Sequence, residues 1–311
     1  MKIVIVGPGA IGCLFGAFFL KAGEEVCFLD KDKKRTAVFA KKGIRVEGLS
    51  NFRINKIKVT HIPKIVKEAD LVLIATKAYA TEFAIRNIYY FLSPQTFVLT
   101  LQNGLGNVET ISQYVPCPQI LAGVTAQGAT FMDIGHIRHA GKGETIIGPI
   151  VKSKYQKVKL EQIVDAFHKA GFKTKLTTNV ESLLWSKLII NSAINPLTAI
   201  TKLPNGRLLD FPFTRQIMQE VVGEAYRIVK KKKIRLFYSQ PFKEVEEVCK
   251  KTYSNISSML QDVLHQRRTE IDFINGVLVR EGRRLNIPTP VNSVLFALIK
   301  TLESSYNLKV N

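Results

Sequence analysis

The sequence predicts an α/β protein, with a doubly wound sheet in its N-terminal part and an all-helical domain after it. The chain begins with a short apolar run that leads into closely spaced glycines. Continuous apolar runs, typical of buried parallel strands, then alternate with helical periods up to residue 178. From Asn179 onward the strand signals stop and helical periods continue. We therefore expect two domains, residues 1–178 and 179–311.

The start of the chain predicts a nucleotide-binding turn. Ile3–Val6 is typical of a buried strand, and a helix is expected from Ala10 to Leu20. Between them the G-x-G-x-x-G spacing supplies a tight turn, a close backbone approach for a pyrophosphate, and close packing of helix on strand. The amides and positive dipole end of the helix would hold the phosphates. This pattern predicts a Rossmann-type dinucleotide site at Gly7, Pro8, Gly9, Ala10, Ile11 and Gly12.

Two other interpretations of this stretch compete with a nucleotide-binding turn. A lone G-x-G-x-x-G occurs by chance, and residues 3–20 form an uncharged run long enough for a membrane span or a signal sequence. Four glycines and Pro8 suit an inserted helix poorly. A second strand, Glu25–Asp30, ends in an acid about 20 residues downstream, as a dinucleotide-binding βαβ unit requires.

Further elements follow in order. A helix rich in Lys and Arg is expected after Asp30, and two half-exposed strands are expected from period-2 alternation. The predicted strands are 43–48, 55–59, 69–75, 96–101, 120–127, 144–147 and 172–176, with a helix at 157–170. In the helical part, breaks between helices are expected at Pro196, Pro204-Asn-Gly206, Pro241, Pro288 and Pro290.

Composition limits the class of protein. The 311 residues are 46% hydrophobic and 23% charged, which predicts an ordered globular protein. Four scattered cysteines without C-x-x-C spacing are interpreted as buried thiols in a reducing cytoplasm. Five histidines without ligand spacing predict no metal site.

The net charge of +20 makes nucleic-acid binding a hypothesis to weigh. The charges are dispersed, and the densest run, Lys230–Lys233, follows an apolar-periodic segment where cations suit the end of a helix. Aromatic and basic residues do not interleave in the manner of RNA-binding modules. We therefore favour an anionic cofactor and substrate, with no nucleic acid and no membrane as partners.

A polar stripe interrupts an otherwise apolar predicted helix. Lys187, Asn191 and Asn195 follow at i, i+4 and i+8 and span roughly 80° of arc, so all three could face one ligand. Apolar neighbours would partly desolvate Lys187 and lower its pKa, which suits a proton donor. The alternative is a satisfied polar seam against the first domain.

Two further groups carry polar side chains. Ser257, Ser258 and Glu270 could contact a ligand, although an unbroken helix would separate residues 258 and 270 by roughly 18 Å. The alternatives are a helix N-cap for Ser258 and a surface pair with Arg267 for Glu270.

Lys77 and Asn103 follow two predicted strands, where such folds bind ligands, in the cleft between domains; alternatively they are ordinary loop residues.

Taken together, the motifs resemble the ketopantoate reductase family, of the 6-phosphogluconate dehydrogenase-like fold group. They are G-P-G-A-I-G at 7–12, A-T-K-A-Y at 75–79, L-Q-N-G-L-G at 101–106, S-K-L-I-I-N-S-A-I-N-P-L-T at 186–198, and S-S-M-L-Q-D with T-E-I-D-F-I-N-G within 257–276. The resemblance implies a 2-dehydropantoate 2-reductase, which reduces ketopantoate to (R)-pantoate with NADPH in pantothenate and coenzyme A biosynthesis.

The resemblance also implies roles for individual residues. Lys187 matches the proton donor, and Glu270 assists proton transfer or orients the ribose. The positions that match substrate-binding residues are Lys187, Asn191, Asn195, Asn205 and Ser258. The positions that match residues lining the cofactor, besides the glycine-rich turn, are Lys31, Lys77, Asn103, Ala129 and Glu270.

The cofactor choice stays open at Asp30. An acid at the end of the second strand usually favours NADH, whereas Lys31 and the cations after it would attract the 2′-phosphate of NADPH. We favour NADPH.

The rival functions are a related reductase of another 2-keto or imino acid and a non-catalytic dinucleotide sensor. The apolar helical segment 291–302 could support a homodimer.

Overall fold

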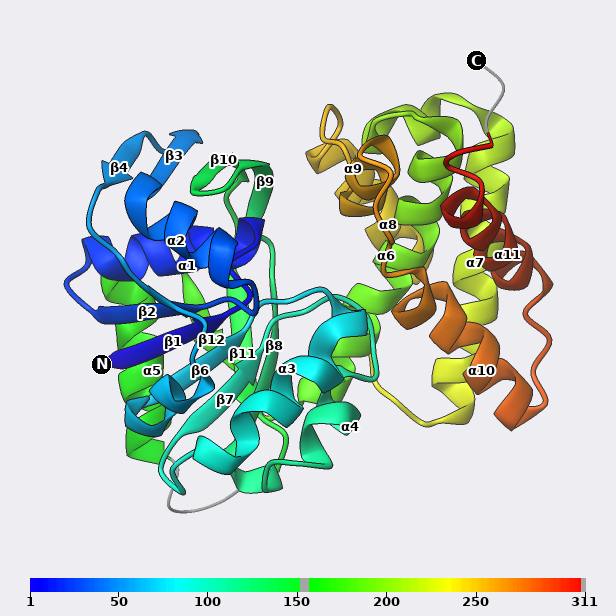
Figure 1. Ribbon diagram of the computed structural model, residues 1–311. Coiled ribbons are helices and arrows are strands. Elements are labelled where there is room, and N and C mark those ends of the chain that lie inside the picture. The colour runs from blue at the N-terminus through cyan, green and yellow to red at the C-terminus, as the bar shows by residue number, and fades with distance from the viewer. Residues whose placement is uncertain (152–156, 309–311) are drawn as a thin grey trace. The chain divides into compact units, whose positions relative to one another are not determined.

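The computed structural model describes residues 1–151 and 157–308 (Figure 1). The chain divides into two compact units, an α/β unit of Met1–Gln102 with Asn107–Val180 and a helical unit of Asn103–Gly106 with Glu181–Asn311. The predicted fold class, a parallel-stranded sheet followed by a helical part, is confirmed. The expected division at residue 178 did not anticipate that the loop 103–106 packs with the helical unit.

The α/β unit is built on a large, mostly parallel sheet. Its strands run in the order β12-β11-β8-β7-β6-β1-β2-β5, and only the β8–β11 pair is antiparallel. The strands of this sheet are β1 (Lys2–Val6), β2 (Glu25–Leu29), β5 (Lys58–Thr60), β6 (Leu71–Ile74), β7 (Phe97–Thr100), β8 (Ile120–Thr125), β11 (Thr145–Pro149) and β12 (Thr174–Leu176). The helices of this unit are α1 (Ala10–Lys21), α2 (Lys33–Lys42), α3 (Thr81–Ile88), α4 (Asn107–Ser112) and α5 (Lys157–Lys169).

Successive residues of the central strands feed two different cores. Ile3 and Ile5 of β1 join the phenylalanine-rich core beneath α1 and α5, whereas Val4 and Val6 join the core that contains residues of α3 and α4. Side chains of a strand alternate between the faces of the sheet, so helices on both faces bury all four residues. This is why the run looks continuously apolar in the sequence.

A second, four-stranded sheet was not predicted. It has the order β4-β3-β10-β9 and contains β3 (Ile44–Gly48), β4 (Phe52–Ile54), β9 (Gly128–Asp133) and β10 (His136–Gly141). The hairpin of β9 and β10 was missed because one of the buried positions of β10 is a histidine, His139, and because β10 gains its parallel partner, β3, from far away in the chain. The strand expected at 55–59 was also placed wrongly, since it begins at Lys58.

The helical unit surrounds one long central helix, α6 (Val180–Thr201). Around it lie α7 (Pro212–Lys231), α8 (Pro241–Lys251), α9 (Ser258–Leu264), α10 (Asn275–Leu285) and α11 (Pro290–Ser304). Buried residues of all six helices form one apolar core, including Ile189, Val221, Val245 and Leu278.

The expected helix break at Pro196 is wrong, because α6 continues through this proline to Thr201. Proline has no N–H, so the carbonyl of Ser192, four residues earlier, loses its helical donor. The Asn275 side chain of α10 supplies the missing donor, with Nδ2 3.1 Å from that carbonyl oxygen. A contact from a distant segment therefore offsets the local defect and keeps the polar stripe on one continuous helix.

The uncharged run of residues 3–20 does not form a single helix. No helix within the described residues has both the length and the hydropathy that a membrane span needs. The uncharged run is divided between β1 and the 12-residue helix α1, whose buried residues pack in the phenylalanine-rich core.

Candidate active site

The turn between β1 and α1 has the backbone that its glycines suggest. Gly7 has φ +87°, in the left-handed region that favours glycine, and an added Cβ would lie 2.5 Å from Cγ2 and 2.9 Å from N of Thr76. At Gly12 a Cβ would lie 2.6 Å from the Gly7 carbonyl oxygen. Both positions therefore require glycine, one for conformation and space and the other for close packing of helix on strand.

Gly9 differs from both, because a Cβ there would meet no atom within 4 Å. It precedes α1, whose first turn carries no acidic residue. The open space therefore lies beside a helix N-terminus, where backbone N–H groups and the helix dipole favour an anion. These residues fit the pyrophosphate of a dinucleotide.

The acid after β2 is already paired. Asp30 is 7% exposed, and its Oδ2 lies 3.1 Å from Nε of Arg35 on α2. The same guanidinium donates through Nη2 to the carbonyl oxygen of Pro8, 3.2 Å away, in the glycine-rich turn. Lys31 is exposed, and its Nζ lies 5.4 Å from the centre of the Phe83 ring. From the sequence, Arg35 was only one of several cations after Asp30. Its position five residues after an acid at a strand end could have indicated the ion pair.

The first strand-end loop lies beside the glycine-rich turn. Lys77 immediately precedes a short 3-10 turn after β6, and the neighbouring Thr76 is the residue that approaches Gly7. Gln102, after β7, donates from Nε2 to the Thr76 carbonyl at 2.8 Å. This hydrogen bond joins the ends of two adjacent parallel strands.

The second loop, which carries Asn103, packs within the helical unit. Leu105 N donates to the Phe273 carbonyl at 2.9 Å. Gly104 has φ +83°, and a Cβ there would overlap the same carbonyl. Asn103 is thus placed beside the segment that begins with Glu270. Ala129, by contrast, lies on β9 of the α/β unit, opposite His139 in the unpredicted hairpin.

Lys187 lies on α6 with a perturbed ammonium. Burial lowers the pKa of Lys187 from 10.5 to about 8, although the negative charge of Glu270 opposes this shift. Glu270 is 6% exposed, so a surface position for it is excluded. The structure therefore brings these two predicted catalytic residues into electrostatic contact.

Hydrogen bonds connect the end of α6 that carries Asn195 to the N-terminus of α9. Asn191 is half-buried and Asn195 is 6% exposed. The Thr198 hydroxyl donates to the Asn195 carbonyl at 2.8 Å, so in its 2.6 Å contact with Ser257 it must accept. Ser257 in turn accepts from Leu260 N at 3.0 Å. Thr198 was not singled out from the sequence.

The N-cap alternative for Ser258 is wrong, because Ser257 caps α9 and Ser258 is its first helical residue. The unbroken helix considered for residues 258–270 does not exist either. Helix α9 ends at Leu264, and the chain reverses at Gln266, which has φ +52°.

Asn205 has a buried acceptor without a partner. Its Nδ2 donates to Thr252 Oγ1 at 3.0 Å, and its backbone N donates to the Asn255 carbonyl at 2.9 Å. Its Oδ1 is buried and accepts no hydrogen bond. Buried polar atoms are nearly always hydrogen-bonded, so this oxygen is suited to accept a hydrogen bond from a ligand. The segment 252–258 thus contacts both Asn205 and Thr198 of α6.

The predicted site residues therefore form two groups. The α/β unit holds the glycine-rich turn with Lys31, Lys77 and Ala129. The helical unit holds Asn103, Lys187, Asn191, Asn195, Asn205, Ser258 and Glu270. A parallel sheet with this glycine turn, together with a helical unit that holds a desolvated lysine, defines a dinucleotide-dependent oxidoreductase.

Comparison with known proteins identifies the family. Residues 3–152 match the family described as ketopantoate reductase PanE/ApbA, and residues 179–303 match its C-terminal domain. A curated 2-dehydropantoate 2-reductase of Pyrococcus horikoshii is 37% identical over 304 residues, 98% of each chain. The chain belongs to the ketopantoate reductase family of NAD(P)H-dependent oxidoreductases.

Solved structures agree with this assignment. A PanE/ApbA family ketopantoate reductase from Ralstonia eutropha JMP134 has a TM-score of 0.88 at 32% identity, covering 98% of this chain and 99% of that one. D-mandelate dehydrogenase, solved with NADH and anilino(oxo)acetate, has a TM-score of 0.91 at 26% identity, covering 99% of this chain and 100% of that one.

Proposed function

We propose that this enzyme reduces the C2 ketone of 2-dehydropantoate to (R)-pantoate, with NADPH as the hydride source and Lys187 as the proton donor. The observation that carries the proposal is the lowered pKa of Lys187, about 8, on a helix that also presents Asn191 and Asn195. The full-length similarity to 2-dehydropantoate 2-reductases supports the choice of substrate.

Lys187 has the properties that the reaction needs. A bound reduced nicotinamide supplies the hydride, and negative charge then develops on the ketone oxygen. An ammonium with a pKa of about 8 is about nine-tenths protonated at pH 7, so it stabilises that charge and then donates its proton. An unperturbed lysine would be a poorer donor by more than two pH units.

Glu270 has a supporting role in this proposal. Its charge raises the pKa of Lys187 against the effect of burial, which keeps the lysine protonated at neutral pH. The same carboxylate is suited to accept from a ribose hydroxyl of the cofactor.

The substrate is held by the amides and the serine. Asn205 Oδ1, the buried acceptor without a partner, would accept from the substrate hydroxyl. Asn191, Asn195 and Ser258 would hold the carboxylate and the ketone in the attack geometry, which contributes to the rate by fixing orientation.

The preference for NADPH is supported by the Arg35–Asp30 ion pair. An unpaired acid at the end of β2 would repel a 2′-phosphate, whereas here a guanidinium compensates its charge. Lys31 adds a second cation next to the same residue. The glycine-rich turn would hold the pyrophosphate at Gly9.

A second candidate function has its own support in the likeness to D-mandelate dehydrogenase, a structure solved with NADH. That candidate is an NADH-dependent reductase of another 2-keto acid.

Steady-state kinetics distinguish the two candidate functions. The assay measures oxidation of NADPH and of NADH with 2-dehydropantoate and with a panel of 2-keto acids that includes phenylglyoxylate. We expect kcat/KM for 2-dehydropantoate with NADPH to exceed every other pair by about 100-fold. Comparable rates across the panel, or a large preference for NADH, would overturn the proposal.

A further inference from the structure

The segment that carries Glu270 has little helical support of its own. Residues 265–270 follow the end of α9 without forming a helix, and only the short turn Ile271–Phe273 precedes α10. Within the segment, Ile271 N donates to Thr269 Oγ1 at 3.2 Å, and Phe273 N donates to the Glu270 carbonyl at 3.0 Å. A carboxylate on such a segment keeps one position only if other elements hold the backbone.

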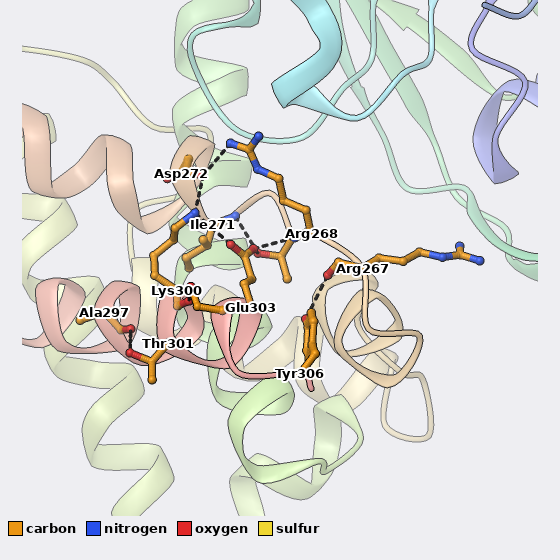
Figure 2. Close-up of polar contacts among 11 residues, drawn as sticks. Arg267, Arg268, Ile271, Asp272, Ala297, Lys300, Thr301, Glu303 and Tyr306 are labelled. Atoms are coloured by element: carbon orange, nitrogen blue, oxygen red, sulfur yellow. Dashed lines mark hydrogen bonds and ion pairs between the residues drawn. The ribbon is translucent and has the colours of Figure 1, made fainter. Parts of the chain in front are cut away.

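The C-terminal part of the chain supplies these contacts. Glu303, on the last turn of α11, accepts through Oε1 from both the backbone N and the hydroxyl of Thr269, each at 2.7 Å. Lys300, one turn earlier, donates to Asp272 Oδ2 at 3.2 Å and to Glu303 Oε2 at 2.9 Å. Figure 2 shows these contacts converging from α11 on the segment.

A third contact lies on the other side of Glu270. The Tyr306 hydroxyl, just beyond α11, donates to the Arg267 carbonyl at 3.0 Å (Figure 2). The anchored residues are therefore Arg267, Thr269 and Asp272, which bracket Glu270 in the sequence.

Among these contacts, the Glu303–Thr269 pair is the best protected from water. Thr269 is fully buried, and the Glu303 side chain is 9% exposed. Hydrogen bonds that involve an ionised acceptor are shorter and stronger than neutral ones, more so away from solvent. By contrast, the Arg268–Asp272 pair involves an arginine side chain that is 53% exposed, and such surface pairs contribute little.

We propose that Glu303 is a positioning residue, which acts through Thr269 to hold the Glu270 carboxylate in place beside Lys187. This inference rests on the proposed roles of Lys187 and Glu270. Displacement of a catalytic group by about 1 Å is enough to lower a rate by about 100-fold.

The test compares Glu303→Ala with Glu246→Ala, a matched control in which a glutamate of α8 loses Arg215, its partner at 2.6 Å. We expect Glu303→Ala to lower kcat by about 10- to 100-fold, with KM for 2-dehydropantoate changed less than about threefold. The control should keep kcat within about twofold. Glu303→Gln, which retains an oxygen acceptor for Thr269, should recover most of the lost kcat.

The pH profile gives a readout that a purely structural role would not move. The charge of Glu270 raises the pKa of Lys187, so its displacement should shift the alkaline limb of kcat to lower pH in Glu303→Ala. Besides Glu303 itself, the titratable and charged groups of the segment and of the helices packed on it include His265, Arg267, Arg268, Asp272, Arg280 and Lys300, and these six remain in this variant.

A double-mutant cycle with Glu270→Gln separates the inference from the function on which it rests. We expect Glu303→Ala to cause no further loss of kcat in the Glu270→Gln background. An equal loss in both backgrounds, or wild-type kcat and pH profile in Glu303→Ala, would overturn the positioning role. If Glu270→Gln alone left activity unchanged, the proposed role of Glu270 would fail instead.

Should Glu303→Ala not fold, as judged by circular dichroism, Thr269→Val takes its place in the same cycle. Thr269→Val removes only the hydroxyl that donates to Glu303 and accepts from Ile271 N. We expect it to lower kcat in the wild-type background and not in the Glu270→Gln background. Unchanged kcat in a folded Thr269→Val protein would count against the inference.

Discussion

Replacement of Lys187 by methionine should make the protein more stable while it removes activity. Folding places the ammonium where its charge is disfavoured, and methionine has a similar length without a charge. The expectation is unusual, because substitutions at half-buried positions commonly destabilise. It follows directly from the proposal that Lys187 is desolvated for catalysis.

The magnitude follows from the pKa of Lys187, which folding lowers from 10.5 to about 8. Such a shift corresponds to about 3.4 kcal/mol against the charged form. It already contains the attraction of Glu270, so it is the net cost of charging the lysine in the folded state.

The sign of the pH dependence is fixed by the same values. Between pH 8 and 10.5 the unfolded chain binds more protons at Lys187 than the folded chain, so wild-type stability rises with pH in that window. The advantage of Lys187→Met should therefore be about 3 kcal/mol at pH 7 and below about 1 kcal/mol at pH 10.

The assay is urea unfolding followed by tryptophan fluorescence. The chain has one tryptophan, Trp185, which is 4% exposed and lies on α6 two residues before Lys187, so it reports on the helical unit. The exposed Lys243 on α8 provides the control, and Lys243→Met should change stability by less than about 0.5 kcal/mol. A Lys187→Met protein that is no more stable than wild type at pH 7, or whose advantage is the same at pH 10, would refute the reasoning.

Three further outcomes are expected. Arg35→Gln leaves Asp30 without its guanidinium, so the ratio of kcat/KM for NADPH over NADH should fall by about tenfold or more in steady-state assays; an unchanged ratio would remove Arg35 from cofactor selection. Gly9→Ala should leave Tm unchanged, because the added Cβ meets no atom within 4 Å. The same substitution should weaken NADPH binding by about tenfold in a fluorescence titration, and normal affinity would contradict the position proposed for the pyrophosphate. Asn275→Leu should lower the free energy of unfolding by about 1–3 kcal/mol, since the carbonyl that Pro196 leaves without a donor would stay unpaired. A loss below about 0.5 kcal/mol would show that this contact is dispensable.

The glycine-rich turn is a feature that neighbouring residues in the sequence are enough to predict. Its conformation depends on residues within one βαβ unit, and the positions with a left-handed φ or close packing, Gly7 and Gly12, are those that the spacing indicates. The apolar runs of β1, β6 and β7 were similarly readable, because strands buried on both faces leave no polar residues to interrupt the pattern.

The hairpin of β9 and β10 is a feature that the local sequence did not predict. One buried position of β10 is a histidine, His139, and β10 pairs in parallel with β3, which lies about ninety residues earlier in the sequence. Ala129 was therefore named as a candidate without its strand being recognised. The sequence also left open whether residues 258–270 form one helix, because the residue with a positive φ at the reversal of the chain, Gln266, is not a glycine.

The sequence by itself determined the fold class, the glycine-rich turn and the residue types of the polar stripe, because each depends on neighbours within a few turns of the chain. Tertiary structure alone decided that α6 continues through Pro196 and that α11 holds the segment of Glu270. The pKa of Lys187 belongs to this second group. Desolvation and the field of a distant carboxylate arise only when segments far apart in the chain are packed together.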